Sequence, residues 1–153
     1  MRALELKVPP LAVMLCAGAA MWLAAAAAPA LTLDWPFATV AAGALALAGL
    51  AVALAGVLSF RRARTTVNPV TPGAASALVT SGIYRLTRNP MYLGFALVLL
   101  AWAVFLGNVL ALVLLPAFVL YIDRFQIEPE ERVLSALFGE AFVAYTTQVR
   151  RWL

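Results

Sequence analysis

Four long stretches of the sequence contain no charged residue, and they constrain the fold more than any other feature. They cover residues 9–28, 37–60, 91–106 and 109–122, while the 11 basic and 7 acidic residues stand between and beyond them. A helix of about 20 residues rises about 30 Å, the thickness of the hydrocarbon core of a bilayer. With 65% hydrophobic residues, the chain is predicted to be an all-α, multi-pass membrane protein.

The first two stretches predict two long spans. Residues 9–28 follow a basic start with Arg2 and Lys7 and are rich in alanine, which also resembles a signal peptide. A retained span is favoured because the run is long and three further apolar stretches follow it. Residues 37–60 contain three glycines that would allow close helix packing: Gly43, Gly49 and Gly56. Their presence can also reflect nothing more than a composition rich in small residues.

The last two stretches predict a short helical hairpin. Residues 91–106 and 109–122 are brief for upright spans, Gly107-Asn108 between them is a turn signal, and Pro116 is expected to kink the second helix. The predicted fold therefore has four transmembrane helices, of which the last two form the hairpin. A hairpin that only dips into the membrane is the alternative, and it leaves both termini on the same side.

The charges predict the orientation of the chain. Residues 61–88 contain five basic residues and no acidic one, which predicts that this loop lies in the cytoplasm and, with four spans, that both termini do too. The alanine-rich composition suggests a bacterial protein, and hence a bacterial inner membrane. Within it, residues 65–73 are rich in turn-forming residues. After residue 122 a new helix is expected to begin near Pro129 and to continue as an amphipathic cytoplasmic segment, divided by Gly139, with an apolar face made of Leu134, Leu137, Phe138, Phe142 and Tyr145.

Several function classes are excluded by what the sequence lacks. There is no histidine, and Cys16 has no partner, so histidine-dependent hydrolysis and cysteine or histidine metal sites cannot be built. Neither a GxGxxG nor a GxxxxGK[ST] phosphate loop occurs. The basic residues beside the membrane are explained by topology and anionic lipids, so no nucleic acid partner and no metal are expected. The predicted spans contain almost no polar residues, which argues against a transporter.

Two polar clusters stand at the two ends of the hairpin. One is GIYRLTRNPMYLG at residues 82–94, and the other spans residues 126–131. A tight hairpin brings Arg88, Asn89 and Tyr92 near Glu130 and Glu131. A carboxylate pair can hold ribose hydroxyls or an ammonium group, and arginine with asparagine can hold a carboxylate, which suits a zwitterionic, nucleotide-like cofactor. The plainer interpretation, a solvated helix start beside topology-setting arginines, stays open on these residues alone.

These clusters carry a resemblance. Residues 82–94, followed by EERVL at 130–134 and by Phe138-Gly139, resemble the signature of the isoprenylcysteine carboxyl methyltransferase and phospholipid methyltransferase group of integral membrane enzymes. The resemblance covers roughly residues 65–152. In two places the sequence departs from the pattern of the group: Asn89 replaces the usual histidine, and Phe142 replaces the first tyrosine of the tail. Asparagine cannot titrate, so proton transfer at position 89 is excluded.

The resemblance implies a single membrane methyltransferase domain over residues 1–153, with two spans in 1–60 and the catalytic core in 61–153. It implies S-adenosyl-L-methionine as cofactor, in a cytoplasm-facing pocket with a lateral opening for a lipid-like acceptor. By position, the residues implied at the cofactor are Arg88, Asn89, Pro90, Tyr92, Gly94, Glu130 and Glu131. Tyr84 and Arg85 fall on the acceptor side, where they are the candidate catalytic residues.

The acceptor is less constrained than the cofactor. A carboxylate needs no deprotonation before methylation, so a chain without histidine favours O-methylation of an isoprenoid or other lipid carboxylate, with Arg85 as its partner. The alternatives are N-methylation of a phospholipid amine, with Glu or Tyr as the base, and a non-catalytic membrane scaffold or lipid-binding protein. The expected partners are membrane lipids and a lipophilic small-molecule acceptor.

Overall fold

A computed structural model describes residues 5–63, 73 and 76–153, and the part of the chain that it describes contains helices and no strand. Arg2, Arg64 and most of the predicted turn segment 65–73 lie outside these residues. Within the described residues, six α-helices and three short helical turns follow one another: α1 (Pro10–Ala27), η2 (Pro29–Leu31), α2 (Ala38–Arg62), η4 (Gly82–Arg85), α3 (Pro90–Leu106), α4 (Val109–Ile122), η5 (Asp123–Ile127), α5 (Glu128–Phe138) and α6 (Glu140–Gln148).

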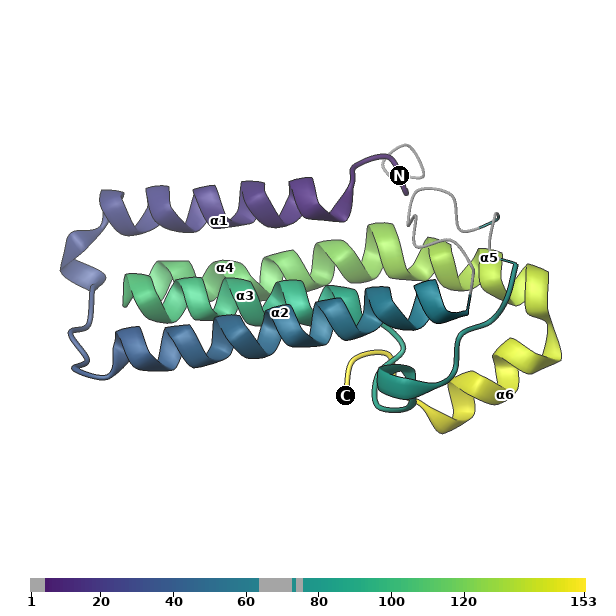
Figure 1. The fold of residues 1–153 in the computed structure, drawn as a ribbon. Coiled ribbons are helices and arrows are strands. Elements are labelled where there is room, and N and C mark those ends of the chain that lie inside the picture. The colour runs from purple at the N-terminus through teal and green to yellow at the C-terminus, as the bar shows by residue number, and fades with distance from the viewer. Residues whose placement is uncertain (1–4, 64–72, 74–75) are drawn as a thin grey trace.

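The four apolar helices α1 to α4 lie lengthwise beside one another and alternate in direction (Figure 1). The starts of α1 and α3 and the ends of α2 and α4 therefore meet at one end of the bundle. We call this the polar end, because Arg61 and Arg62 end α2 there, α5 extends α4 beyond it and α6 folds back toward it. The predicted all-α architecture is confirmed, and the segment before α1 and the carboxy terminus lie toward this same end.

Helices α2 and α3 pack backbone against backbone. A Cβ atom added to Gly49 would lie 2.7 Å from the carbonyl oxygen of Gly94, and one added to Gly94 would lie 2.6 Å from the carbonyl oxygen of Gly49. Near the polar end, a Cβ atom on Gly56 would lie 3.1 Å from the ring of Pro90. Two of the three predicted packing glycines therefore have this role, whereas Gly43 faces open space.

The predicted turn at Gly107-Asn108 is confirmed, and it also ties the far end of the bundle together. Gly107 ends α3 in the left-handed conformation (φ 61°), which glycine adopts without strain. The Asn108 side chain, 2% exposed, accepts a hydrogen bond from Leu110 N at the start of α4. Its amide donates to Ala28 O at 2.9 Å and to Thr32 Oγ1 at 3.1 Å, so one residue satisfies backbone groups of both loops.

Three helices are long and apolar enough to cross a membrane. They are Pro10–Ala27, Ala38–Arg62 and the continuous helix Val109–Phe138, of which the first part is α4. Helix α3 is apolar but only 17 residues long, and it packs between α2 and α4. The count of four spans therefore stays a prediction, while a membrane protein with at least three candidate spans is what the described residues show.

Two details of the tail differ from the sequence-based expectations. Helix α5 begins at Glu128 with Pro129 in its first turn, as expected, but it is not a separate helix, because α4 continues into α5 through the π-helical turn η5, in which the Glu128 N–H bonds to Asp123 O. Leu137 is 48% exposed and does not share the buried face of Phe142 and Tyr145. Pro116 lies inside α4, which runs unbroken through it, and the predicted kink there stays a prediction. The predicted division at Gly139 is confirmed, since α5 ends and α6 begins on either side of it.

The packing of α2 on α3 gives a stability test. Gly94→Leu should lower the free energy of unfolding by about 1–3 kcal/mol or more, because its side chain would drive the two backbones apart. Gly43→Leu is the matched control, since its side chain enters open space in the same helix pair. Thermal unfolding in detergent compares the two, and equal midpoints would contradict the close packing.

Candidate functional site

The site is built on the corner where residues 82–90 lead into α3. Gly82 is in the left-handed conformation (φ 63°), and the short helix η4 then places Tyr84 against the ring of Phe60 with a centroid distance of 5.3 Å. The Tyr145 hydroxyl of α6 donates a 2.7 Å hydrogen bond to Tyr84 O. Tyr84 and Tyr145 are both buried, so this corner is fixed by α2 on one side and α6 on the other.

Arg88 fastens the carboxy-terminal tail to this corner. Its backbone N–H donates to Arg150 O at 3.0 Å. Its Nη1 donates to Thr146 O at 3.1 Å and to Val149 O at 2.9 Å, the free carbonyls at the end of α6. The side-chain amide of Asn89 donates to Arg151 O at 3.0 Å. Most of the hydrogen-bond donors of Arg88 and Asn89 that have partners therefore bond to the carboxy-terminal tail.

A network of ion pairs closes the site. Glu131 accepts from Arg88 Nη2 at 2.8 Å, and Arg151 reaches the same carboxylate with two nitrogens, at 2.6 and 3.2 Å. Arg151 also pairs with Asp123 at 2.9 Å. The side chains of Arg88 and Glu131 are only 13% and 20% exposed, so these charge-assisted bonds are stronger than an exposed pair.

Glu130 has a different environment from its neighbour. It accepts a short hydrogen bond from the Tyr92 hydroxyl, and among the residues that the structure describes it forms no ion pair. A carboxylate in mostly apolar surroundings is costly without a cationic partner. Glu130 is therefore the acidic group of the site that is left to meet a ligand.

The cavity between these groups is small, apolar and aromatic, with a volume of about 90 Å³. Its polar or aromatic lining comes from four segments: Phe60, Tyr84, Arg88, Asn89, Tyr92, Glu130, Glu131, Phe142 and Tyr145. A wider polar groove of about 530 Å³ lies behind Arg88, Glu131 and Phe142, which line both spaces. The Arg88–Glu131 pair therefore stands between an inner apolar cavity and an outer polar groove.

Two of the three tyrosines that line the cavity, Tyr84 and Tyr145, keep their hydroxyls protonated at neutral pH. Burial raises the pKa of Tyr145 to about 12, although the neighbouring Arg88 guanidinium lowers it in part. Burial raises the pKa of Tyr84 further above its usual value, and Tyr145 and Glu130 add to the rise. Tyr84 therefore acts as a neutral phenol and is a poor candidate for a base.

Six of the nine predicted site residues line the cavity, and three do not. Tyr84, Arg88, Asn89, Tyr92, Glu130 and Glu131 meet there, as the hairpin geometry requires. Arg85 is exposed and does not line the cavity. Pro90 and Gly94 face α2, where they contact Gly56 and Gly49, so their placement is that of packing residues and departs from the predicted cofactor contact.

The sequence reasoning missed part of the site. Arg151 and Asp123 complete the ion-pair network, and Tyr145 with Phe142 forms the wall from α6. From sequence alone, residues 150–152 would be interpreted as an interfacial anchor, because Arg-Arg-Trp is also typical of a membrane boundary. Only the pairing of Arg151 with the partly buried carboxylate of Glu131 distinguishes the two roles, and that pairing is a tertiary contact.

Comparison with known proteins identifies the family of this site. A sequence model described as phospholipid methyltransferase matches residues 37–141, which is more than half of the chain. The chain belongs to the phospholipid methyltransferase family. The resemblance drawn from residues 82–94 and 130–139 is thereby confirmed, and the matched region includes every predicted site residue.

Two further comparisons add little about function. An uncharacterized protein of Haemophilus influenzae is 48% identical over 63 residues, which are 41% of this chain and the whole of that protein. No solved structure gives a significant match. The family therefore establishes a membrane methyltransferase, and the geometry above carries what can be inferred about its reaction.

The role of Arg88 in this family member can be tested by exchanging its guanidinium for an ammonium. Arg88→Lys should lower the free energy of unfolding by about 2–4 kcal/mol, because a point charge cannot reach two carbonyls and a carboxylate together. Arg85→Lys, an exposed neighbour, is the control. Thermal unfolding and the rate of tail proteolysis report the change, and equal behaviour of the two variants would refute the fastening role.

Proposed function

We propose that the chain transfers a methyl group from S-adenosyl-L-methionine to a lipid-like amine at the membrane surface. The observation that carries the proposal is Glu130, a carboxylate bonded to Tyr92 and facing an apolar, aromatic cavity at the end of a membrane bundle. Such a cavity accepts an apolar molecule with a polar head, and the unpaired carboxylate selects a cationic head.

The residues around the cavity fit the cofactor. Arg88 lines both spaces, and its buried Nε has no hydrogen-bond partner in the described part of the chain, so one donor of the guanidinium is not used by the protein. The outer groove has the size of a small-molecule site, whereas the inner cavity alone is too small. Arg88 and Arg151 would face the cofactor carboxylate, and Glu131 its ammonium or hydroxyl groups.

S-adenosyl-L-methionine supplies a methyl group on a sulfonium, which is already activated for an in-line displacement. The work left to the protein is alignment and exclusion of water. The rings of Phe60, Tyr84 and Phe142 exclude water from the inner cavity, and Tyr92 fixes the direction of the Glu130 carboxylate. Catalysis in this proposal therefore rests on position and electrostatics, together with one proton transfer from the acceptor.

The placement of Glu130 favours an amine over a carboxylate as acceptor. An ammonium head must lose one proton before its nitrogen can form the new N–C bond, and Glu130 can accept that proton. Tyr84 is a poor base because its pKa is raised. A carboxylate acceptor would meet the negative charge of Glu130, while its predicted partner Arg85 lies outside the cavity. O-methylation is therefore the second candidate.

The orientation of the site belongs to the same proposal. Arg61 and Arg62 end α2 at the polar end, and the basic bias of residues 61–88 supports placing this end, with the cavity, on the cytoplasmic side of a bacterial inner membrane. The cofactor would then enter the site from the cytoplasm, and the lipid headgroup from the cytoplasmic surface of the membrane.

The acceptor class can be tested with deuteriomethyl-labelled cofactor. Purified protein in liposomes that contain phosphatidylethanolamine should give a labelled lipid whose label survives mild alkaline hydrolysis of esters, as an N-methyl group does. Liposomes with a prenylated cysteine analogue are the comparison, and an alkali-labile label there would favour O-methylation. Folded protein that binds no cofactor in calorimetry would remove the enzyme proposal and favour the non-catalytic scaffold.

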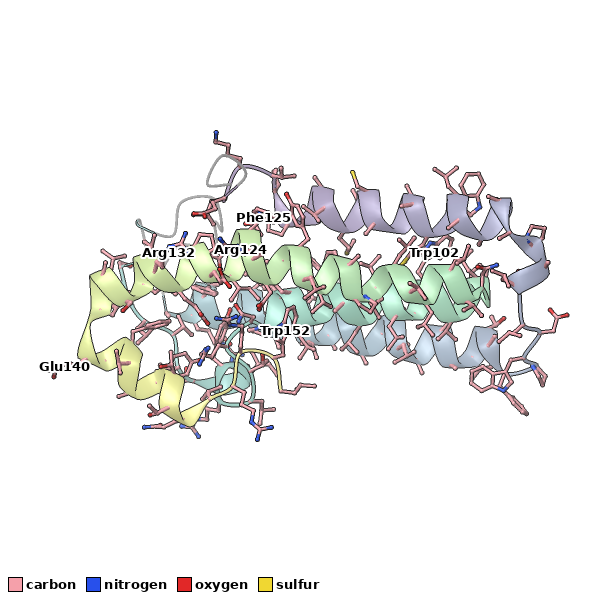
Figure 2. The ribbon with its side chains drawn as sticks, turned by 180° about the vertical axis from the view of Figure 1, so that it is seen from behind. Trp102, Arg124, Phe125, Arg132, Glu140 and Trp152 are labelled. Atoms are coloured by element: carbon pink, nitrogen blue, oxygen red, sulfur yellow. The ribbon has the colours of Figure 1, made fainter. Side chains whose placement is uncertain are left out.

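Glu130 gives the sharpest mutational test of this mechanism. Glu130→Gln should reduce the turnover of the labelled amine by about 10²–10⁴-fold, because the amide cannot accept a proton. Glu140→Gln, an exposed residue at the turn between α5 and α6, is the matched control (Figure 2). Turnover within about threefold of the parent protein in Glu130→Gln would show that Glu130 is neither base nor ammonium partner.

A further inference from the structure

The π-helical turn η5 sets the direction in which the two glutamates of the site point. Helix α4 continues through Asp123–Ile127 into α5, and the turn inserts one extra residue into the helical register. One residue corresponds to about 100° of rotation around a helix. Without this turn, Glu130 and Glu131 would be rotated away from Tyr92 and Arg88, so the contacts that form the cavity depend on the turn being kept.

A π-helical turn is rare and needs support from outside the helix. The support comes from residues 5–8, the segment immediately before α1, which we call the strap. Leu6 N–H donates a 3.1 Å hydrogen bond to Phe125 O, and Glu5 forms an ion pair with Arg132 of α5. Phe125 and Arg132 lie on the side of α4–α5 nearest this segment (Figure 2).

The hydrogen bond from Leu6 replaces one that the helix cannot make. In a regular α-helix the carbonyl of Phe125 would accept from the N–H of residue 129, but that residue is Pro129 and has no N–H. Leu6 is held at φ 57°, a conformation that a leucine rarely adopts. A leucine keeps such a φ only where its surroundings hold it, and here the same residue donates its N–H to the Phe125 carbonyl.

Gln126 provides the second link between strap and turn. Its side chain is 0% exposed among the core residues Ile122 and Ile127, and its Nε2 donates a 2.7 Å hydrogen bond to Val8 O. An amide in such a position costs free energy unless it is bonded, and an apolar side chain of the same length would fill the volume without that cost. The Gln126 Oε1 is also buried, and it has no hydrogen-bond partner in the described part of the chain, so the bond from Nε2 to the strap is the contact that accounts for an amide here.

We infer that Gln126 is a positioning residue for the cavity, acting through the strap, the π-helical turn and Glu130, although it does not line the cavity itself. For its effect on the reaction this inference rests on the proposed function. Its structural half does not, because the Tyr92–Glu130 contact can be followed without any cofactor.

A double-mutant cycle on stability tests the structural half. Gln126→Met keeps length and removes the amide, and Tyr92→Phe removes the hydroxyl that bonds Glu130. If Gln126 holds Glu130 in place, Tyr92→Phe should lower the unfolding midpoint less than half as much in the Gln126→Met background as in the parent protein. Additive shifts would overturn the inference. Gln148→Leu, at an exposed glutamine of α6, is the control and should combine additively with Tyr92→Phe.

Cofactor binding tests the functional half. Calorimetry with S-adenosylhomocysteine should show a Kd about tenfold higher for Gln126→Met than for the parent protein, with Gln148→Leu unchanged. If the parent protein binds no S-adenosylhomocysteine while the two substitutions are still non-additive in stability, the proposed function alone is refuted. If the parent protein binds it and Gln126→Met leaves the Kd unchanged, the positioning role is overturned.

A second variant keeps the inference open to refutation if Gln126→Met does not fold. Leu6→Gly retains the N–H that bonds Phe125 and adopts a positive φ without strain. It should therefore leave the S-adenosylhomocysteine Kd within about twofold and keep or raise the unfolding midpoint. A tenfold weaker Kd would show that the leucine side chain, and not the backbone bond of the strap, supports the turn, and would overturn the inference.

Discussion

The site depends on one arginine that is shared between three parts of the chain. Arg88 lies in the corner before α3, donates to two carbonyls at the end of α6 and pairs with Glu131 of α5. In water such contacts would contribute little, but here they are largely shielded, and both Nη nitrogens of the guanidinium donate to oxygens within hydrogen-bond distance. The tail, the second helix of the hairpin and the corner therefore form one unit at the polar end.

The apolar part of the molecule makes this concentration of charge possible. Helices α2 and α3 approach at Gly49 and Gly94 until their backbones touch, which fixes where the corner at Arg88 stands. At the opposite end, the Asn108 side chain bonds the Ala28 carbonyl and the Leu110 N–H, two backbone groups that a membrane-embedded hairpin would leave open. Polar groups are thus used sparingly along the bundle and gathered where a ligand can reach them.

Much of this arrangement could be predicted from patterns in the chain. Charge-free runs predicted the apolar helices, Gly107-Asn108 predicted the hairpin, and the hairpin predicted that Arg88 and Tyr92 meet Glu130 and Glu131. The motifs at residues 82–94 and 130–139 also led to the family, because they are local in sequence. The sequence could not show whether Pro90 and Gly94 contact a cofactor or pack against a helix, because either role is compatible with the same residue type.

The sequence by itself determined that the chain is a helical membrane protein and which residues gather at one end, because hydrophobic periodicity and turn chemistry are local properties. Only the tertiary structure decided that Arg151 joins Glu131 and that Arg85 faces outward. It also decided that α4 passes into α5 through a π-helical turn held by residues 5–8. Each of these depends on a partner that is distant in sequence, and no local pattern specifies such a partner.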